Sequence, residues 1–125
     1  MLLLLDTHVL LWTMFEPAKL SDTMRTEIPS THNVVCVSMV SLWEIAIKQS
    51  IGKLSIPDIF FETVYKKSNF ELLSLESPHI EQYRSLPLHH RDPFDRMLIA
   101  QAQTEKLTIV TSDEKILQYD VSILK

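Results

Sequence analysis

Short apolar runs alternate along the chain with longer segments in which apolar residues recur at helical spacing. The runs are rich in Leu, Val and Ile and span residues 2–5, 34–37, 72–75, 107–110 and, more weakly, 121–124. Such runs are typical of strands buried on both faces, as in parallel sheets. The segments between them predict helices over 8–15, 21–28, 39–51, 58–69, 78–85 and 93–105. The alternation predicts an α/β domain, in which a mostly parallel sheet of four or five strands lies between layers of helices.

Length and composition narrow the classes of protein further. A chain of 125 residues has the length of one domain, so we expect residues 1–125 to form a single domain. The chain has one glycine, Gly52, so glycine-rich phosphate loops are excluded. It has one cysteine, Cys36, so an intrachain disulfide and multi-cysteine zinc sites are excluded as well. We find neither the pattern of a signal peptide nor an apolar run that could span a membrane. We therefore expect a reduced, cytoplasmic, soluble protein.

Acidic residues stand where a parallel sheet places its ligands, just after the strands. Asp6 follows the first run directly, and Asp113 comes shortly after the fourth. Glu44 lies in the helix after the second run, and Asp92 and Asp95 begin the helix before the fourth. Crowded carboxylates repel one another unless a cation neutralises them, and hard oxygen ligands suit Mg²⁺ or Mn²⁺. With two such ions, one could activate a water while the other stabilises the leaving oxygen of a phosphodiester.

Each of these carboxylates also has a purely structural interpretation. Asp6, Asp92 and Asp113 can cap the helices that follow them, Asp92 with Pro93 at the first helical position. Asp95 lies on the apolar stripe that its helix should press onto the sheet, where the positive helix N-terminus supplies part of a partner. The residues alone leave both interpretations open.

Residues 41–48 have a structural interpretation as well. Glu44 stands at capping-box spacing from Ser41 and can pair with Lys48 one turn later. Trp43, like Trp12 in the first helix, occupies an apolar helical position and is expected in the core. The segment His89-His90-Arg91 could contact phosphate, but it lacks metal-ligand spacing and is expected to be a solvated loop.

Four motifs match one known family, in the family's order. They are LLDTH at 4–8, SLWEIA at 41–46, LHHRDPFDRMLIAQA at 88–102 and TSDE at 111–114. With these motifs the chain resembles the PIN domain, and more closely the VapC-type ribonuclease toxins of bacterial toxin–antitoxin pairs. The resemblance extends from residue 2 to about residue 121.

The resemblance implies a site and its ligands. It implies a catalytic quartet that binds Mg²⁺ or Mn²⁺, consisting of Asp6, Glu44, Asp95 and Asp113. The Thr111 hydroxyl would support this quartet. The alignment selects Asp95 over Asp92, because alanines follow Asp95 at the expected distances. The basic residues that we expect to hold substrate phosphates are Arg91, Arg96 and Lys115.

We therefore expect a metal-dependent endoribonuclease that acts on RNA and is the toxin of a toxin–antitoxin pair. The resemblance also implies a cognate antitoxin and a toxin homodimer. One alternative is a receiver-like signalling module that binds Mg²⁺, although that class needs an acidic pair after its first strand, where this chain has only Asp6. The other is a PIN-like binding scaffold with a silent site. The net charge of −4 gives no general attraction for nucleic acid, so bound cations would have to offset the carboxylates.

Two segments carry more apolar residues than a small domain with one sheet should need to bury. They are 21–28, with Met24 and Ile28, and 58–69, with Phe60, Phe61 and Val64. We interpret part of this surface as a groove for an antitoxin helix or for a second copy of the chain.

Overall fold

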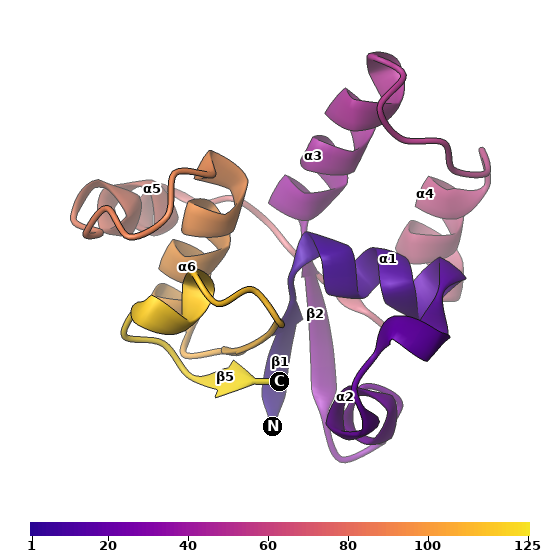
Figure 1. Cartoon of the computed structure of the whole chain (residues 1–125), viewed down its shortest axis with the longest axis horizontal. Coiled ribbons are helices and arrows are strands. Elements are labelled where there is room, and N and C mark those ends of the chain that lie inside the picture. Colours follow the sequence, from indigo (N-terminus) through magenta and orange to yellow (C-terminus); the bar gives the residue numbers. More distant parts are fainter.

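A computed structural model describes residues 1–125 and contains one five-stranded sheet with helices on both faces (Figure 1). Its strands are β1 (Leu2–Leu5), β2 (Val34–Ser38), β3 (Glu71–Leu73), β4 (Thr108–Val110) and β5 (Ile123–Leu124). They lie in the order β3-β2-β1-β4-β5, and every neighbouring pair is parallel. The predicted α/β fold with a parallel sheet between helices is confirmed.

Six α-helices connect the strands close to the predicted positions. They are α1 (Thr7–Phe15), α2 (Asp22–Glu27), α3 (Met39–Ser50), α4 (Phe60–Glu62), α5 (Ser77–Arg84) and α6 (Pro93–Glu105). The predicted helix over 58–69 is split, because after one α-turn it continues as the π-turn η2 (Thr63–Lys67). Short 3₁₀ turns, η1 (Pro17–Lys19) and η3 (Ile116–Gln118), follow α1 and β4. No helix is both long and apolar enough to cross a bilayer.

The central strand β1 divides the core in two. Leu3 and Leu5 pack with residues of α1 to α4, whereas Leu4 points to the opposite face and packs with α6. Figure 1 shows the same division, with α1 to α4 on one side of the sheet and α5 and α6 on the other. Because helices cover both faces, a central strand has no solvent-facing side and every position can be apolar.

The edge strand β3 differs from the prediction. The apolar run at 72–75 predicted a strand buried on both faces, but the strand covers Glu71–Leu73 and none of its residues is buried. β3 has only β2 as a neighbour, so its apolar side chains lie at the margin of the helical layers. Hydrophobic pattern alone does not distinguish an edge strand from a central one.

The apolar residues of α2 and α4 fill the core and do not form a groove. Met24, Ile28, Phe60 and Val64 are between 1% and 8% exposed and belong to the core under α1 and α3. Only Phe61 remains half-buried, packed against that core. The groove interpretation is therefore wrong for the residues on which it was based, since this face of the sheet needs them to close its own core.

Trp43 is also placed differently from the prediction. On α3, the side chains at positions 41, 42, 44 and 45 face the interior and are buried. The side chains at positions 43, 46 and 50 lie on the opposite face of the helix and are exposed. Trp43 is therefore 60% exposed and packs edge-on against Phe94, with the ring centroids 5.3 Å apart. Trp12 is half-buried against the core rather than inside it.

A buried polar pair ties α3 and α6 to the same end of β2. The Ser38 hydroxyl accepts from the Val40 amide (3.0 Å), which caps α3, and donates to Gln101 Oε1 of α6 (2.6 Å). Since Ser38 is the cap, the capping box predicted for Ser41 and Glu44 is wrong. The pair anchors the start of α3 and the second half of α6 at the carboxyl end of β2.

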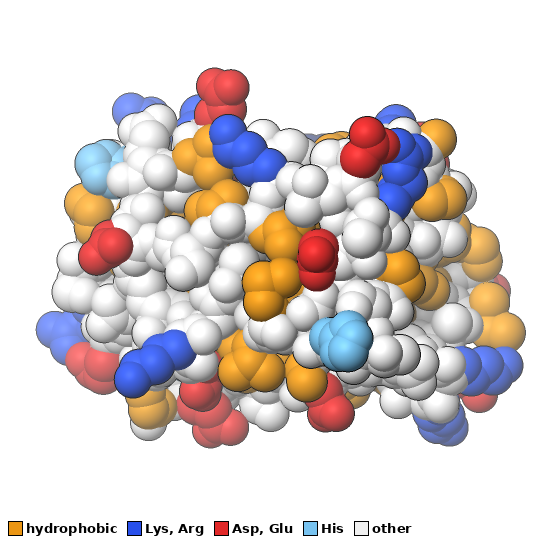
Figure 2. Space-filling view, turned by 90° about the horizontal axis from the view of Figure 1, so that it is seen from below, with side chains coloured by type: hydrophobic (Ala, Val, Ile, Leu, Met, Phe, Trp, Pro, Cys, Tyr) orange, Lys and Arg blue, Asp and Glu red, His pale blue; other side chains and the backbone are white.

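Charged side chains of both signs are mixed at the opposite end of the sheet. Figure 2 views the molecule from below Figure 1, toward the amino ends of the strands. Acidic and basic side chains are interspersed there with apolar ones. A surface of mixed sign has no field that would attract a polyanion.

Candidate active site

The acidic residues meet in the crevice where the direction of the strand order changes. The chain leaves β1 toward β2 on one side, whereas β4 lies on the other side of β1. Ligands of open α/β sheets bind at such a switch point, outside the carboxyl ends of the strands. Asp6, after β1, and Asp113, after β4, line one shallow pocket there with His8, Trp12 and Ser112.

Asp6 is held on both of its oxygens. Oδ1 accepts from the Val9 amide (2.7 Å) and so caps α1, and Oδ2 accepts from the Thr111 hydroxyl. The Thr111 hydroxyl also accepts from the Asp113 amide (3.0 Å), which ties the two acidic loops together. Burial raises the pKa of Asp6 despite these hydrogen bonds. The capping role and a place in the crevice are thus compatible.

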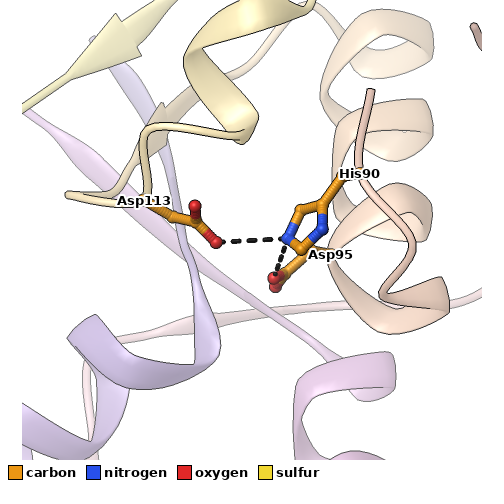
Figure 3. Close-up of side chains that lie close together, drawn as sticks. All are labelled: His90, Asp95 and Asp113. Atoms are coloured by element: carbon orange, nitrogen blue, oxygen red, sulfur yellow. Dashed lines mark hydrogen bonds and ion pairs between the residues drawn. The ribbon is translucent and has the colours of Figure 1, made fainter. Parts of the chain in front are cut away.

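Asp95 and Asp113 meet at one imidazole, that of His90 (Figure 3). His90 comes from the loop before α6, Asp95 from the first turn of α6, and Asp113 from the loop after β4. His90 Nε2 lies 2.9 Å from Asp95 Oδ2 and 3.1 Å from Asp113 Oδ2. Asp113 Oδ1 accepts from the Lys115 amide (2.9 Å), so Asp113 also caps the turn that follows it. His90 is only 8% exposed, and the solvated-loop prediction is wrong for it.

The site carries more negative charge than the chain itself offsets. The pKa of Asp95 is raised to about 7, first by burial, then by the charge of Asp92 and, less, of Asp6; the hydrogen bond with His90 opposes the rise. Ligand atoms of His90, Asp95 and Asp113 lie within 4.8 Å of one another. Carboxylate oxygens are the ligands that Mg²⁺ or Mn²⁺ prefers. The residues present therefore fit a divalent cation.

Asp92 is the N-cap of α6. Its Oδ1 accepts from the amides of Phe94 (2.8 Å) and Asp95 (3.2 Å). The capping interpretation of the Asp-Pro step is confirmed. The charge of Asp92 still acts on its neighbour, since it raises the pKa of Asp95.

Glu44, from α3, lies apart from the group around His90 and contacts the first residue of α1. It is 3% exposed, and its Oε1 accepts from the Thr7 hydroxyl (2.8 Å). Its Oε2 pairs with the Lys48 ammonium (2.9 Å). The hydrogen bond to Glu44 and the charges of Asp92 and Asp95 raise the pKa of Lys48. Lys48 therefore stays cationic beside the carboxylates, and Glu44 does not join the group around His90.

The three basic candidates are placed unequally. Arg91 and Lys115 are exposed and flank His90 and Asp113 in the chain. Arg96 turns away, with its guanidinium 4.6 Å from the centre of the Tyr83 ring and hydrogen bonds to the Tyr83 hydroxyl and the Leu86 carbonyl. Of the three, only Arg91 and Lys115 are exposed, whereas Arg96 is engaged by Tyr83 and Leu86.

Comparison with known proteins shows the family of this chain. The family model of the PIN domain matches residues 3–122. This chain belongs to the PIN domain family. PIN domains are nuclease domains, so membership assigns phosphodiester chemistry to the chain, and the receiver-like alternative is not retained. No curated protein matches the sequence significantly.

Solved structures share the PIN fold with this chain over nearly its whole length. VapBC2 from Rickettsia felis, bound to a DNA fragment from its promoter, matches with a TM-score of 0.75 and 16% identity, over 99% of this chain and 98% of that chain. VapBC-1 from nontypeable Haemophilus influenzae matches with a TM-score of 0.70 and 14% identity, over 100% of this chain and 98% of that chain. A toxin–antitoxin complex from Klebsiella pneumoniae matches with a TM-score of 0.65 and 16% identity, over 98% of this chain and 95% of that chain. At such low identity, the structural similarity shows a shared fold and nothing further.

Removal of the Lys48 ammonium tests how strongly this PIN domain depends on the buried Glu44. We expect Lys48→Met to lower the free energy of unfolding by about 1–3 kcal/mol, because a buried carboxylate oxygen loses its partner. Lys19→Met is the matched control: Lys19 pairs with Glu16 at 3.0 Å, but both side chains are more than half exposed. Its effect should stay within about 0.5 kcal/mol. Urea unfolding measures both, and equal effects would contradict the prediction.

Proposed function

We propose that this PIN domain is an endoribonuclease that uses Mg²⁺ or Mn²⁺ to hydrolyse phosphodiester bonds in RNA. The observation that carries the proposal is the closeness of Asp95 and Asp113, together with Asp6, which shares a pocket with Asp113 and acts by its charge on Asp95, in the switch-point crevice of a PIN domain. A divalent ion, when bound, supplies Lewis-acid polarisation of a phosphoryl oxygen and a more acidic water. The ligands that we propose are these three carboxylates, with Glu44 at the edge of the site.

The contribution of the chain is to hold charge in fixed positions. Asp6 is oriented by a main-chain amide and by Thr111, and Asp113 by the Lys115 amide and His90. Groups that are already oriented need no reorganisation as charge develops on the reacting phosphate. Arg91 and Lys115 would hold neighbouring phosphates. Because RNA bases are most accessible where they are unpaired, we expect an exposed loop of a structured RNA as the substrate.

We further propose that the chain is the toxin of a toxin–antitoxin pair and acts in the cytoplasm. Solved structures with this fold include VapBC proteins and a toxin–antitoxin complex. The partners would be a cognate antitoxin that covers the crevice and a second copy of the toxin.

Cleavage of RNA by the purified protein should require Mg²⁺ or Mn²⁺ and stop in EDTA. The reason is that the crowded carboxylates of the crevice leave the site without the positive charge that a phosphodiester needs. The assay follows total RNA and a structured RNA on gels and maps the new 5′ ends. Full cleavage in EDTA, with contaminating nucleases excluded, would refute the metal requirement. No cleavage with either ion would favour the alternative of a binding scaffold with a silent site.

A further inference from the structure

His90 is the buried residue of the crevice that the acidic motifs leave without a role. Its main chain is fixed from outside the site, because the Tyr119 hydroxyl accepts from the amides of both His89 (3.0 Å) and His90 (2.9 Å). Tyr119 is itself only 5% exposed. The backbone at His90 is thus anchored to the segment after η3, and the ring enters the crevice from an immobilised position (Figure 3).

The surroundings of the two ring nitrogens indicate which one carries the proton. Nδ1 accepts from the main-chain amide of Asp92 (3.4 Å), so in the neutral ring Nδ1 offers its lone pair and the proton is on Nε2. Nε2 faces Oδ2 of Asp95 and Oδ2 of Asp113, both of which accept. One N–H is therefore shared between carboxylates from two different elements. An Nε2 that donates in this way has no lone pair for a metal ion.

We propose that His90 is a positioning residue that holds Asp95 and Asp113 in the arrangement in which they bind a divalent cation, without binding the cation itself. Two carboxylates this close repel each other, and a shared N–H offsets the repulsion and fixes the orientation of both groups. Asp95 Oδ1 makes no hydrogen bond within the chain and stays available to a ligand. The inference rests on the proposed function, because it assumes that these carboxylates bind a cation.

The first test measures the affinity of the full chain for Mn²⁺ by electron paramagnetic resonance titration. We expect His90→Ala to weaken Mn²⁺ binding about 10–100-fold, the usual cost of removing a group that orients a ligand. His90→Gln, which keeps a side-chain N–H at similar reach, should recover most of the affinity. His89→Ala is the matched control, because the His89 ring packs on Tyr119, 5.1 Å between centroids, and touches no carboxylate. It should bind Mn²⁺ like the parent.

The second test asks whether the ring touches the ion and needs no variant. Electron spin-echo measurements on the Mn²⁺-loaded parent should show no directly bound nitrogen. NMR of the metal-free parent near pH 8 should show the proton of His90 on Nε2.

For the first test, thermal melts in EDTA identify any His90 or His89 variant that has lost its fold.

The outcomes separate the two proposals. Unchanged or tighter Mn²⁺ binding in His90→Ala, a directly bound nitrogen, or a proton on Nδ1 would each overturn the role of His90 while leaving the nuclease in place. A folded parent that neither binds Mn²⁺ nor cleaves RNA would refute the proposed function, and the role of His90 with it.

Discussion

Asp95→Asn is expected to reduce RNA cleavage by on the order of 100-fold or more, whereas Asp92→Asn should stay within a few-fold of the parent. Asparagine keeps the shape of Asp95 but removes the charge that a cation at this site needs. At Asp92 the same change keeps the cap, since asparagine accepts from the amides of Phe94 and Asp95 about as well as aspartate does. Initial rates with saturating Mn²⁺ measure both variants.

This pair of variants is matched in chemistry and lies within one helical turn. An inactive Asp92→Asn beside an active Asp95→Asn would show that the motif has been aligned wrongly. The loss of the Asp92 charge should also lower the pKa of Asp95, because that charge helps to raise it. The pH dependence of cleavage by Asp92→Asn should therefore shift to lower pH.

The metal-free protein should lose stability as pH rises from about 4 to about 7, and Asp95→Asn should remove that part of the loss. The pKa of Asp95 is about 7 in the folded chain, against an ordinary value of 3.8. Between these values the unfolded chain releases a proton that the folded chain retains, so a stability contribution present below pH 4 is gone above pH 7. Its full size is at most about 4 kcal/mol.

Urea unfolding in EDTA at pH 5 and pH 8 measures this effect as the difference between parent and variant. Carboxylates that do not interact with Asp95 titrate alike in both proteins and cancel in that difference. We expect Asp95→Asn to be the more stable protein at pH 8, and Mn²⁺ to raise the melting temperature of the parent more than that of the variant. A variant less stable than the metal-free parent at pH 8 would contradict the prediction.

The order of the elements followed from local pattern, because periodicity and capping depend on neighbours in the sequence. Apolar runs located the strands, although β3 starts one residue earlier and ends two residues earlier than its run, and β5 starts two residues later than its run. The Asp-Pro step located the beginning of α6, and Ser38, which the pattern passed over, proved to cap α3. The rule that ligands lie after parallel strands brought Asp6 and Asp113 to one crevice.

Contacts between distant parts of the chain decided the rest. The Thr111 hydroxyl reaches Asp6 across 105 positions, Thr7 reaches Glu44 across 37, and His90 reaches Asp113 across 23. No local pattern contains these partners, so the sequence predicted the pair of Glu44 with Lys48, four residues away, but not the hydrogen bond from Thr7. Nor did it show that Trp43 faces solvent, because a helix with apolar residues on several sides does not state which side will meet the sheet.

The sequence by itself determined the α/β fold, the family resemblance and the acidic residues at the strand ends, because each depends on residue type and spacing along the chain. Only the tertiary structure decided which side chains share a proton or a charge. His90 is the clearest case: its neighbours in the chain are exposed or half-buried, and it is buried because Tyr119 and two carboxylates from other segments enclose it. Burial and electrostatic coupling are properties of the packed molecule, and they distinguish a solvated histidine from one that orients a site.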